Sequence, residues 1–269
     1  MPWQKLIKNL AIVLAICLAC SIILGIVGAF IMIFGFNNDD SIMENAVEIA
    51  ISQEISSVEI SVAAVNLMVF EGDHFALYSN IKNLLAGEEN GTLIIKQKQK
   101  IVGIHTNKVG EVLLMIPTRH EFNSFNIESG AGNVEIEFLQ AVSMDFEFGA
   151  GSANIDNIVA TKRARIEMGA GKLNIDSGVL NCLDLDLGVG KTVINAKVNG
   201  TSSIECGVGN THLNLIGMRD DYCIDIDTGI GSISVDGTHV GGSQIIGNGP
   251  NRINIDGGVG SIVINYNND

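Results

Sequence analysis

Residues 166–175 read IEMGAGKLNI, and near-copies of this stretch stand at residues 127–136 (IESGAGNVEI) and 146–155 (FEFGAGSANI). In each copy, apolar and polar residues alternate on both sides of a Gly-Ala-Gly triplet. Alternation with a period of two is typical of a half-buried β-strand. Glycine adopts positive φ without steric cost, so each triplet predicts a chain reversal between two strands.

The triplet, glycine-apolar-glycine, occurs seven times, at spacings of 19, 20, 19, 19, 22 and 29 residues. The last interval contains an insertion, residues 241–251, that we interpret as a loop. The middle residue of each triplet is apolar, which predicts that it closes the edge of the core at the bend. The turn glycines are Gly130, Gly132, Gly149, Gly151, Gly169, Gly171, Gly188, Gly190, Gly207, Gly209, Gly229, Gly231, Gly258 and Gly260.

One such repeat cannot bury its own apolar side, but repeats stacked about 4.8 Å apart form a continuous interior. We therefore predict an all-β fold, a repetitive parallel β-solenoid with about 19–20 residues and two strands per coil, over residues 121–269. A meander of antiparallel hairpins is the alternative. The near-identity of equivalent positions favours the stack, because equivalent residues then become neighbours.

Residues 46–120 are also rich in strand patterns but are less regular. Residues 112–116 alternate apolar side chains up to Pro117, which predicts the end of a strand. We interpret residues 46–120 as irregular first coils and a cap over the open edge of the sheet.

The N-terminal region predicts a membrane anchor. Residues 10–36 carry no charge over 27 positions, and about 20 apolar residues suffice to span a bilayer. Lys5 and Lys8 precede this segment, which predicts a cytoplasmic tail at residues 1–9, a transmembrane helix at 10–36 and a juxtamembrane linker at 37–45. The remainder is then extracytoplasmic at the cell membrane. A cleaved signal peptide is the alternative, although its apolar region is only about 7–15 residues long.

Small residues recur every fourth position within the apolar segment. Such a row lets transmembrane helices approach closely, and homodimerisation through it is a hypothesis. Its members are Cys17, Ser21, Gly25 and Ala29.

The charge balance restricts the partners. The net charge is −14, and 14 basic and 30 acidic residues follow residue 38. An acidic surface repels polyanions, so nucleic acid is not an expected partner.

Three of the five cysteines lie in the repeats, and they form neither a disulfide framework nor a zinc signature. They are Cys182, Cys206 and Cys223. We expect them to be small buried apolar residues.

The repeated Gly-Ala-Gly turns, the stretch Leu93–Ile95 and the stretch Val112–Pro117 carry a resemblance that covers roughly residues 46–265. On these motifs the chain resembles the bacterial "putative adhesin" family of envelope proteins with a toastrack-type β-solenoid domain. The resemblance implies an envelope location, adhesion or a setting near envelope-stress regulation. It implies no catalytic residues.

No catalytic motif withstands inspection, so we expect no enzyme activity and no cofactor. Residues 188–192 (GVGKT) look like the end of a phosphate-binding loop, but Leu185 stands where that loop needs glycine. The enzyme alternative is a carbohydrate-active protein similar to polysaccharide lyases. It would need clustered acids with an exposed base, and Arg163, Arg165 and Lys172 lie near Glu167 in the sequence.

An acidic residue stands two positions before each triplet. Stacking would place these seven carboxylates in one file, and cations would relieve their mutual repulsion. We predict a non-catalytic binding or scaffold module, adhesin-like or linked to envelope-stress sensing. Its acidic face would bind divalent cations or a cationic peptide or polymer, and its signals would pass through a membrane or envelope protein partner. This acidic column is Glu128, Glu147, Glu167, Asp186, Glu205, Asp227 and Asp256.

Overall fold

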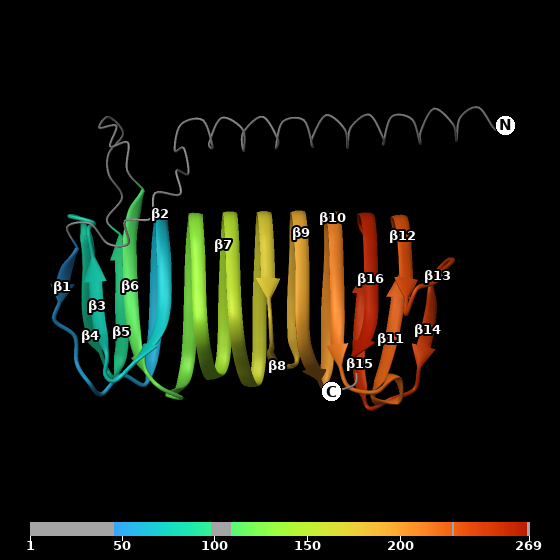
Figure 1. Cartoon of the computed structure of the whole chain (residues 1–269), viewed down its shortest axis with the longest axis horizontal. Helices are drawn as coiled ribbons and strands as arrows, with labels where there is room; N and C mark the ends of the chain where they lie inside the picture. Colours follow the sequence, from blue (N-terminus) through green and yellow to red (C-terminus); the bar gives the residue numbers. More distant parts are fainter. Residues whose placement is uncertain (1–45, 98–108, 228, 268–269) are drawn as a thin grey trace. The chain divides into compact units, whose positions relative to one another are not determined.

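The computed structural model describes residues 46–97, 109–227 and 229–267 (Figure 1). The chain divides into two compact units. One unit, residues 42–102 and 110–269, contains every described strand, and the other, residues 1–41 and 103–109, lies outside the described residues except for Val109. The predicted tail, transmembrane helix, linker and small-residue row all fall outside the described residues. Within the described part, no helix has the length and apolar character needed to cross a membrane.

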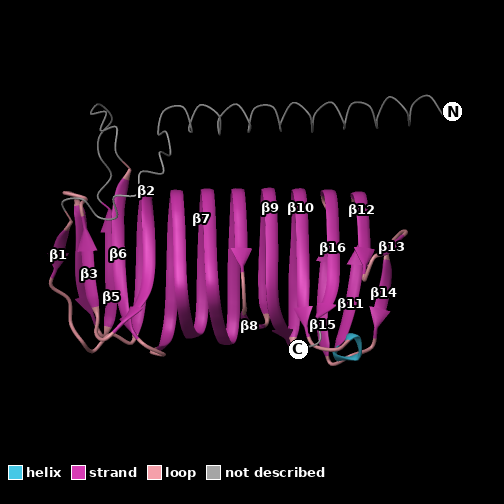
Figure 2. Cartoon of the chain, in the orientation of Figure 1, coloured by secondary structure: helices cyan, strands magenta, loops and turns pink. Residues whose placement is uncertain are grey.

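The described unit is almost entirely β-structure, with a single short 3₁₀ helix, η1 (Arg219–Asp221), among the described residues. Figure 2 shows the strands as successive rungs of one stack. The strands are β1 (Val47–Ile49), β2 (Ser57–Gly72), β3 (Ala76–Ser79), β4 (Leu84–Glu89), β5 (Thr92–Gln97), β6 (Gly110–Pro117), β7 (Glu121–Ile175), β8 (Gly178–Asn181), β9 (Leu183–Asn199), β10 (Thr201–Ile216), β11 (Tyr222–Asp227), β12 (Ile230–Val235), β13 (Thr238–Val240), β14 (Gln244–Gly247), β15 (Asn251–Asp256) and β16 (Val259–Asn267).

Successive coils pair in parallel and in the register that the repeat predicts. Between β9 and β10, Ile204 lies opposite Leu185 and Glu205 opposite Asp186. The same offset relates the end of β7 to β9, where Glu167 lies opposite Asp186. The prediction of an all-β, solenoid-like fold is therefore confirmed.

The core is a column of inward-facing side chains whose kind changes along the stack. Phe122, Phe125 and Phe146 are fully buried at the N-terminal end, with ring centroids 5.1 and 6.5 Å apart in edge-to-face contacts. Such aromatic pairs stabilise by roughly 0.5–1.5 kcal/mol beyond the area that they bury. Farther along, the aliphatic residues Leu185 and Ile204 fill the positions equivalent to Phe146. Because apolar and polar residues alternate along each strand, one side of every coil is buried away from water.

The triplets are corners inside continuous strands, which differs from the predicted strand-turn-strand order. Strand β7 runs unbroken through three triplets, and β9 and β10 each run through one. Both glycines of a triplet are needed for space, and the second also for its backbone conformation. A Cβ at Gly188 would lie 2.1 Å from the carbonyl oxygen of Gly169 in the preceding coil. A Cβ at Gly190 would lie 1.9 Å from that of Gly171, and Gly190 has φ +152°. Close stacking of backbones, rather than chain reversal alone, therefore demands the paired glycines.

The middle residues of the triplets do not close the core, contrary to the prediction. Ala131 is buried, but Val189 and Val208 are half-buried and Ile230 is 60% exposed. The corner turns these side chains outward. The residue before the triplet fills the interior corner instead, as Phe148 and Met168 do.

At the C-terminal end, the order of coils in space differs from their order in the sequence. Strands β15 and β16 pair in parallel with β10 on one side and with β11 and β12 on the other. The triplet at Gly258 therefore lies between those at Gly207 and Gly229. The predicted loop within 241–251 contains β14, which pairs antiparallel with β11.

The N-terminal end is interleaved in the same manner. Strand β2 lies between β7 and the pair β5 and β6, all parallel. Strands β1, β3 and β4 then add antiparallel pairs at the outer edge. At both ends of the stack, the outermost coil is therefore formed by residues that lie farther from the chain terminus than those of the coil next to it.

None of the three cysteines is fully buried as predicted. Cys206 and Cys223 are half-buried, but Cys182 is exposed. Cys182 occupies the left-handed region, with φ 47°, between β8 and β9, and this corner directs its side chain to solvent. All three are free thiols.

Candidate binding face

The acidic column follows from strand alternation. Each of its carboxylates stands one position after a buried apolar residue, so the side chain points outward. Register places Glu205 opposite both Asp186 and Asp256, and Asp227 opposite Asp256. The order in space along this half is Asp186, Glu205, Asp256 and Asp227. Of the seven residues, Glu167 is half-buried and the other six are exposed.

An eighth position in the column escaped sequence reasoning. Strand β2 stacks on β7 with Ser61 opposite Glu128, and the Ser61 hydroxyl donates a hydrogen bond of 2.9 Å to the Glu128 carboxylate. This coil has Ala63 and Val65 at the positions of the two glycines, so it lacks the triplet. Val58 is buried, and the alternation of apolar and polar residues that begins there is the sequence signal that could have identified this coil.

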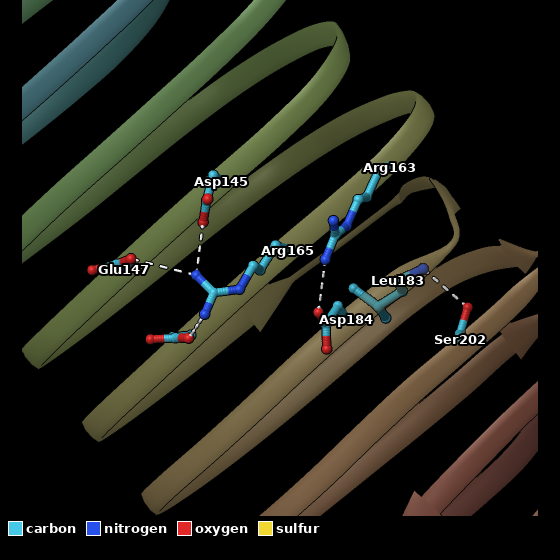
Figure 3. A network of polar contacts seen from close by, with 8 residues as sticks. Asp145, Glu147, Arg163, Arg165, Leu183, Asp184 and Ser202 are labelled. Carbon is cyan, nitrogen blue, oxygen red and sulfur yellow. Dashed lines mark hydrogen bonds and ion pairs between the residues drawn. The ribbon is translucent and has the colours of Figure 1, made fainter.

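One guanidinium joins two successive coils of this face. Arg165 lies between carboxylates of its own coil and of the preceding one, with its nitrogen 3.3 Å from Asp145 and 3.4 Å from Glu147 (Figure 3). It also forms an ion pair with Glu167. The hydrogen bond to Asp145, reinforced by the charges of all three carboxylates, raises the pKa of the Arg165 guanidinium above its usual value. Arg165 is therefore a fixed cation within the N-terminal half of the column.

Two other arginines on this face have one carboxylate partner each. Arg163 contacts Asp184 at 3.0 Å and Arg252 contacts Asp225 at 2.9 Å, as seen for the first pair in Figure 3. Lys172 does not join the cluster proposed from the sequence, because it lies beyond the glycine corner, opposite Lys191 of the next coil.

The C-terminal half of the column lacks such compensation. Within the described ranges, Asp186, Glu205 and Asp256 form no ion pair with a lysine or arginine. We call these three residues the open carboxylates. Adjacent strands lie about 4.8 Å apart, so their charges repel one another across each step.

The N-terminal half of the face contains an open depression of about 200 Å³. Of its lining residues, Glu59 is paired with Lys96, with 2.8 Å between oxygen and nitrogen. Asp145 and Glu147 contact Arg165 and form, with Arg165 and Glu167, what we call the Arg165 cluster. The carboxylates that line it are Glu59, Glu128, Asp145 and Glu147.

The face is not built as a chelating centre. Among the described residues, no three His, Cys, Asp or Glu side chains are grouped so that they could hold one metal ion. The file of single carboxylates, one per coil, instead offers regularly spaced and separate anionic groups.

Replacing Arg165 with glutamine should lower the thermal midpoint, because Asp145, Glu147 and Glu167 would then repel one another without a counterion. Salt screens exposed charges, so added NaCl should recover part of the loss. Thermal unfolding followed by circular dichroism at low and high NaCl measures both effects. Arg163→Gln is the matched control, since it removes one exposed pair and such pairs contribute little. Equal effects of the two substitutions would contradict a special role for Arg165.

The sequence pattern of the family described as "Toastrack DUF4097" matches residues 46–256. Among solved structures, the chain is similar to a "putative adhesin" from Bacteroides fragilis NCTC 9343, with 12% identity, a TM-score of 0.42 and coverage of 81% of this chain and 95% of that one. It is also similar to a "putative cell adhesion protein" from Clostridium sporogenes ATCC 15579, with 15% identity, a TM-score of 0.33 and coverage of 83% and 99%. No curated protein matches the sequence.

Proposed function

The chain belongs to the toastrack DUF4097 family, and from this premise we propose that it is a non-catalytic, membrane-anchored binding module displayed outside the cytoplasm. The rigid stack presents the acidic column as its recognition face. The ligand is a cationic peptide or polymer that carries lysine or arginine side chains at regular intervals.

The contact that supports this proposal is made by Arg165. A guanidinium already satisfies three carboxylates of this face from two successive coils. The open carboxylates Asp186, Glu205 and Asp256 continue the same file without a cation of their own. Their exposure keeps them available, and a file of like charges attracts cations over a distance of about one Debye length, roughly 8 Å at physiological salt.

A cationic chain is favoured over a divalent ion for a geometric reason. Calcium takes 6–8 oxygen ligands around one point. The open carboxylates stand one per coil, and the described residues contain no group of three that could share an ion. A polymer can meet such separate groups one after another.

The depression beside Glu128 and Glu147 is the observation that favours the enzyme alternative, a carbohydrate-active site. It supplies converging carboxylates, but its cations are poor bases. The pKa of Arg165 is raised, and Lys96 is paired with Glu59. Removing a proton from sugar carbon requires an unpaired base, so the binding module remains the better proposal.

Anchoring rests on the sequence. Residues 10–36 are long and apolar enough to span a bilayer. In adhesion the module would act through its own binding face, and in envelope-stress sensing it would pass its signal to a partner membrane protein.

The test is binding of poly-L-lysine to the full-length protein in detergent or nanodiscs. The variant Asp186→Asn/Glu205→Gln/Asp256→Asn should bind much more weakly, and the wild-type affinity should fall as NaCl is raised. The matched control, Glu135→Gln/Asp156→Asn/Asp176→Asn, removes the same charge from exposed carboxylates on the other limb of the coil and should bind like wild type. Equal losses in both variants would reduce the effect to net charge and refute a specific face.

A further inference from the structure

The coil formed by β15 and β16 occupies a slot that the rest of the chain builds around it. Strand β10 forms one wall and strands β11 and β12 form the other, and both walls pair with the inserted coil in parallel. Gly217 and η1 carry the chain from one wall to the other, past the end of the inserted coil. The slot is therefore framed by residues 201–235, and its occupant arrives from residues 251–267.

The inserted coil binds its slot with both backbone and side chains. Ile253, Ile255, Ile262 and Ile264 are all at most 6% exposed. Arg252 forms its ion pair with Asp225 on one wall. These contacts join residues 251–267 to residues of the walls, so they would form identically with a coil of the same sequence from another molecule.

The connection to the inserted coil is short and confined to the surface. Strand β14 ends at Gly247 on the outer edge of β11, and β15 begins at Asn251 on the inner edge. Residues 248–250 alone cross between the two edges, and they include Pro250. Short, constrained hinges favour exchange of an element between copies, since the contacts of the element are kept and only the hinge changes.

We propose that residues 251–267 of one copy fill the slot of a second copy, which produces strand-exchanged dimers. The partner is this same chain, and the inference does not depend on the ligand of the acidic face. Strand β2 is interleaved similarly at the other end, but it continues into β1 and β3 within the described residues. The C-terminal coil is joined to its walls through one described connection and is the exchangeable element.

The test uses two full-length copies with different tags, coexpressed in a background where the five native cysteines are replaced by serine or alanine. One copy carries Ser203→Cys and the other carries Asn254→Cys, positions that lie opposite each other across the slot. Mild oxidation should then produce a disulfide-linked heterodimer on a non-reducing gel. One chain with both substitutions should form the internal link, which checks the geometry of the pair.

The matched control replaces Asn254→Cys by Asp184→Cys. Asp184 lies opposite Ser203 on its other side, in a coil that does not exchange. A dimer formed through the apolar N-terminal segment would raise the heterodimer yield of both cysteine pairs equally. The proposal is therefore tested by the difference between the two yields. If Ser203→Cys impairs folding, Asp225→Cys probes the other wall with the same Asn254→Cys partner. Heterodimer yields from Asn254→Cys no greater than those from Asp184→Cys would overturn the proposal.

Discussion

Replacing Gly190 with alanine is expected to destabilise the stack by roughly 4 kcal/mol or more, at the upper end of what a single substitution costs. An added Cβ would lie 1.9 Å from the carbonyl oxygen of Gly171 in the preceding coil, and φ at Gly190 is +152°. Neither problem can be relieved by a flexible side chain, because the obstructing atom belongs to the backbone. The two coils would have to separate at the corner, which weakens the hydrogen bonds between them.

Urea unfolding followed by circular dichroism measures this effect as a lower midpoint. Gly241→Ala is the matched control, since a Cβ there meets nothing within 4 Å. Its effect should stay within about 0.5 kcal/mol, as for ordinary surface substitutions. Similar midpoints for the two variants would show that the corner glycines are not required for close stacking.

Ending the chain after Pro250 is expected to unfold more than the segment that is removed. Strands β11 and β12 have their parallel partners only in β15 and β16 among the described strands, and the remaining neighbours β13 and β14 are three and four residues long. Loss of four buried isoleucines removes about 2 kcal/mol of burial for each. Residues 217–250 should therefore unfold as well, while β7 and β9 stay folded.

Hydrogen exchange distinguishes the outcomes. Amides of residues 222–235 should lose their protection in the truncated protein, whereas those of β9 should keep it. The substitution Ile255→Asp should reproduce the loss in the full-length chain, and Ile245→Asp should not, because Ile245 is 59% exposed. Retained protection at residues 222–235 would mean that β11 and β12 close directly onto β10, and the slot would then not need its occupant.

The periodic part of this chain was predictable because the relevant physics is local. Alternation around each triplet identifies which side chain enters the core, and the repeat length then places Asp186 between Glu167 and Glu205. The Arg165 cluster was only partly anticipated. Its contacts with Asp145 and Glu147 lie 20 and 18 residues away, which is one coil, and the sequence interpretation considered Glu167 alone.

Two features could not be obtained in this way. The coil of β2 has alanines at its corner, so its place in the stack depends on pairing with β7 rather than on a motif. The corner residues such as Val189 face outward because the glycine corner rotates them. The alternation of apolar and polar residues does not predict this rotation.

From its sequence alone, this chain prescribes a β-structure of stacked coils, the inward and outward sides of each coil, and a file of carboxylates along one limb. Which coil lies beside which is a property of the folded molecule. Every coil offers its neighbours nearly the same parallel edge and the same aliphatic surface, so the pattern cannot distinguish a coil that follows in sequence from one that arrives later. The connections at Gly217 and Pro250 determine the order of the coils, and they place residues 251–267 between two segments that precede them in the sequence.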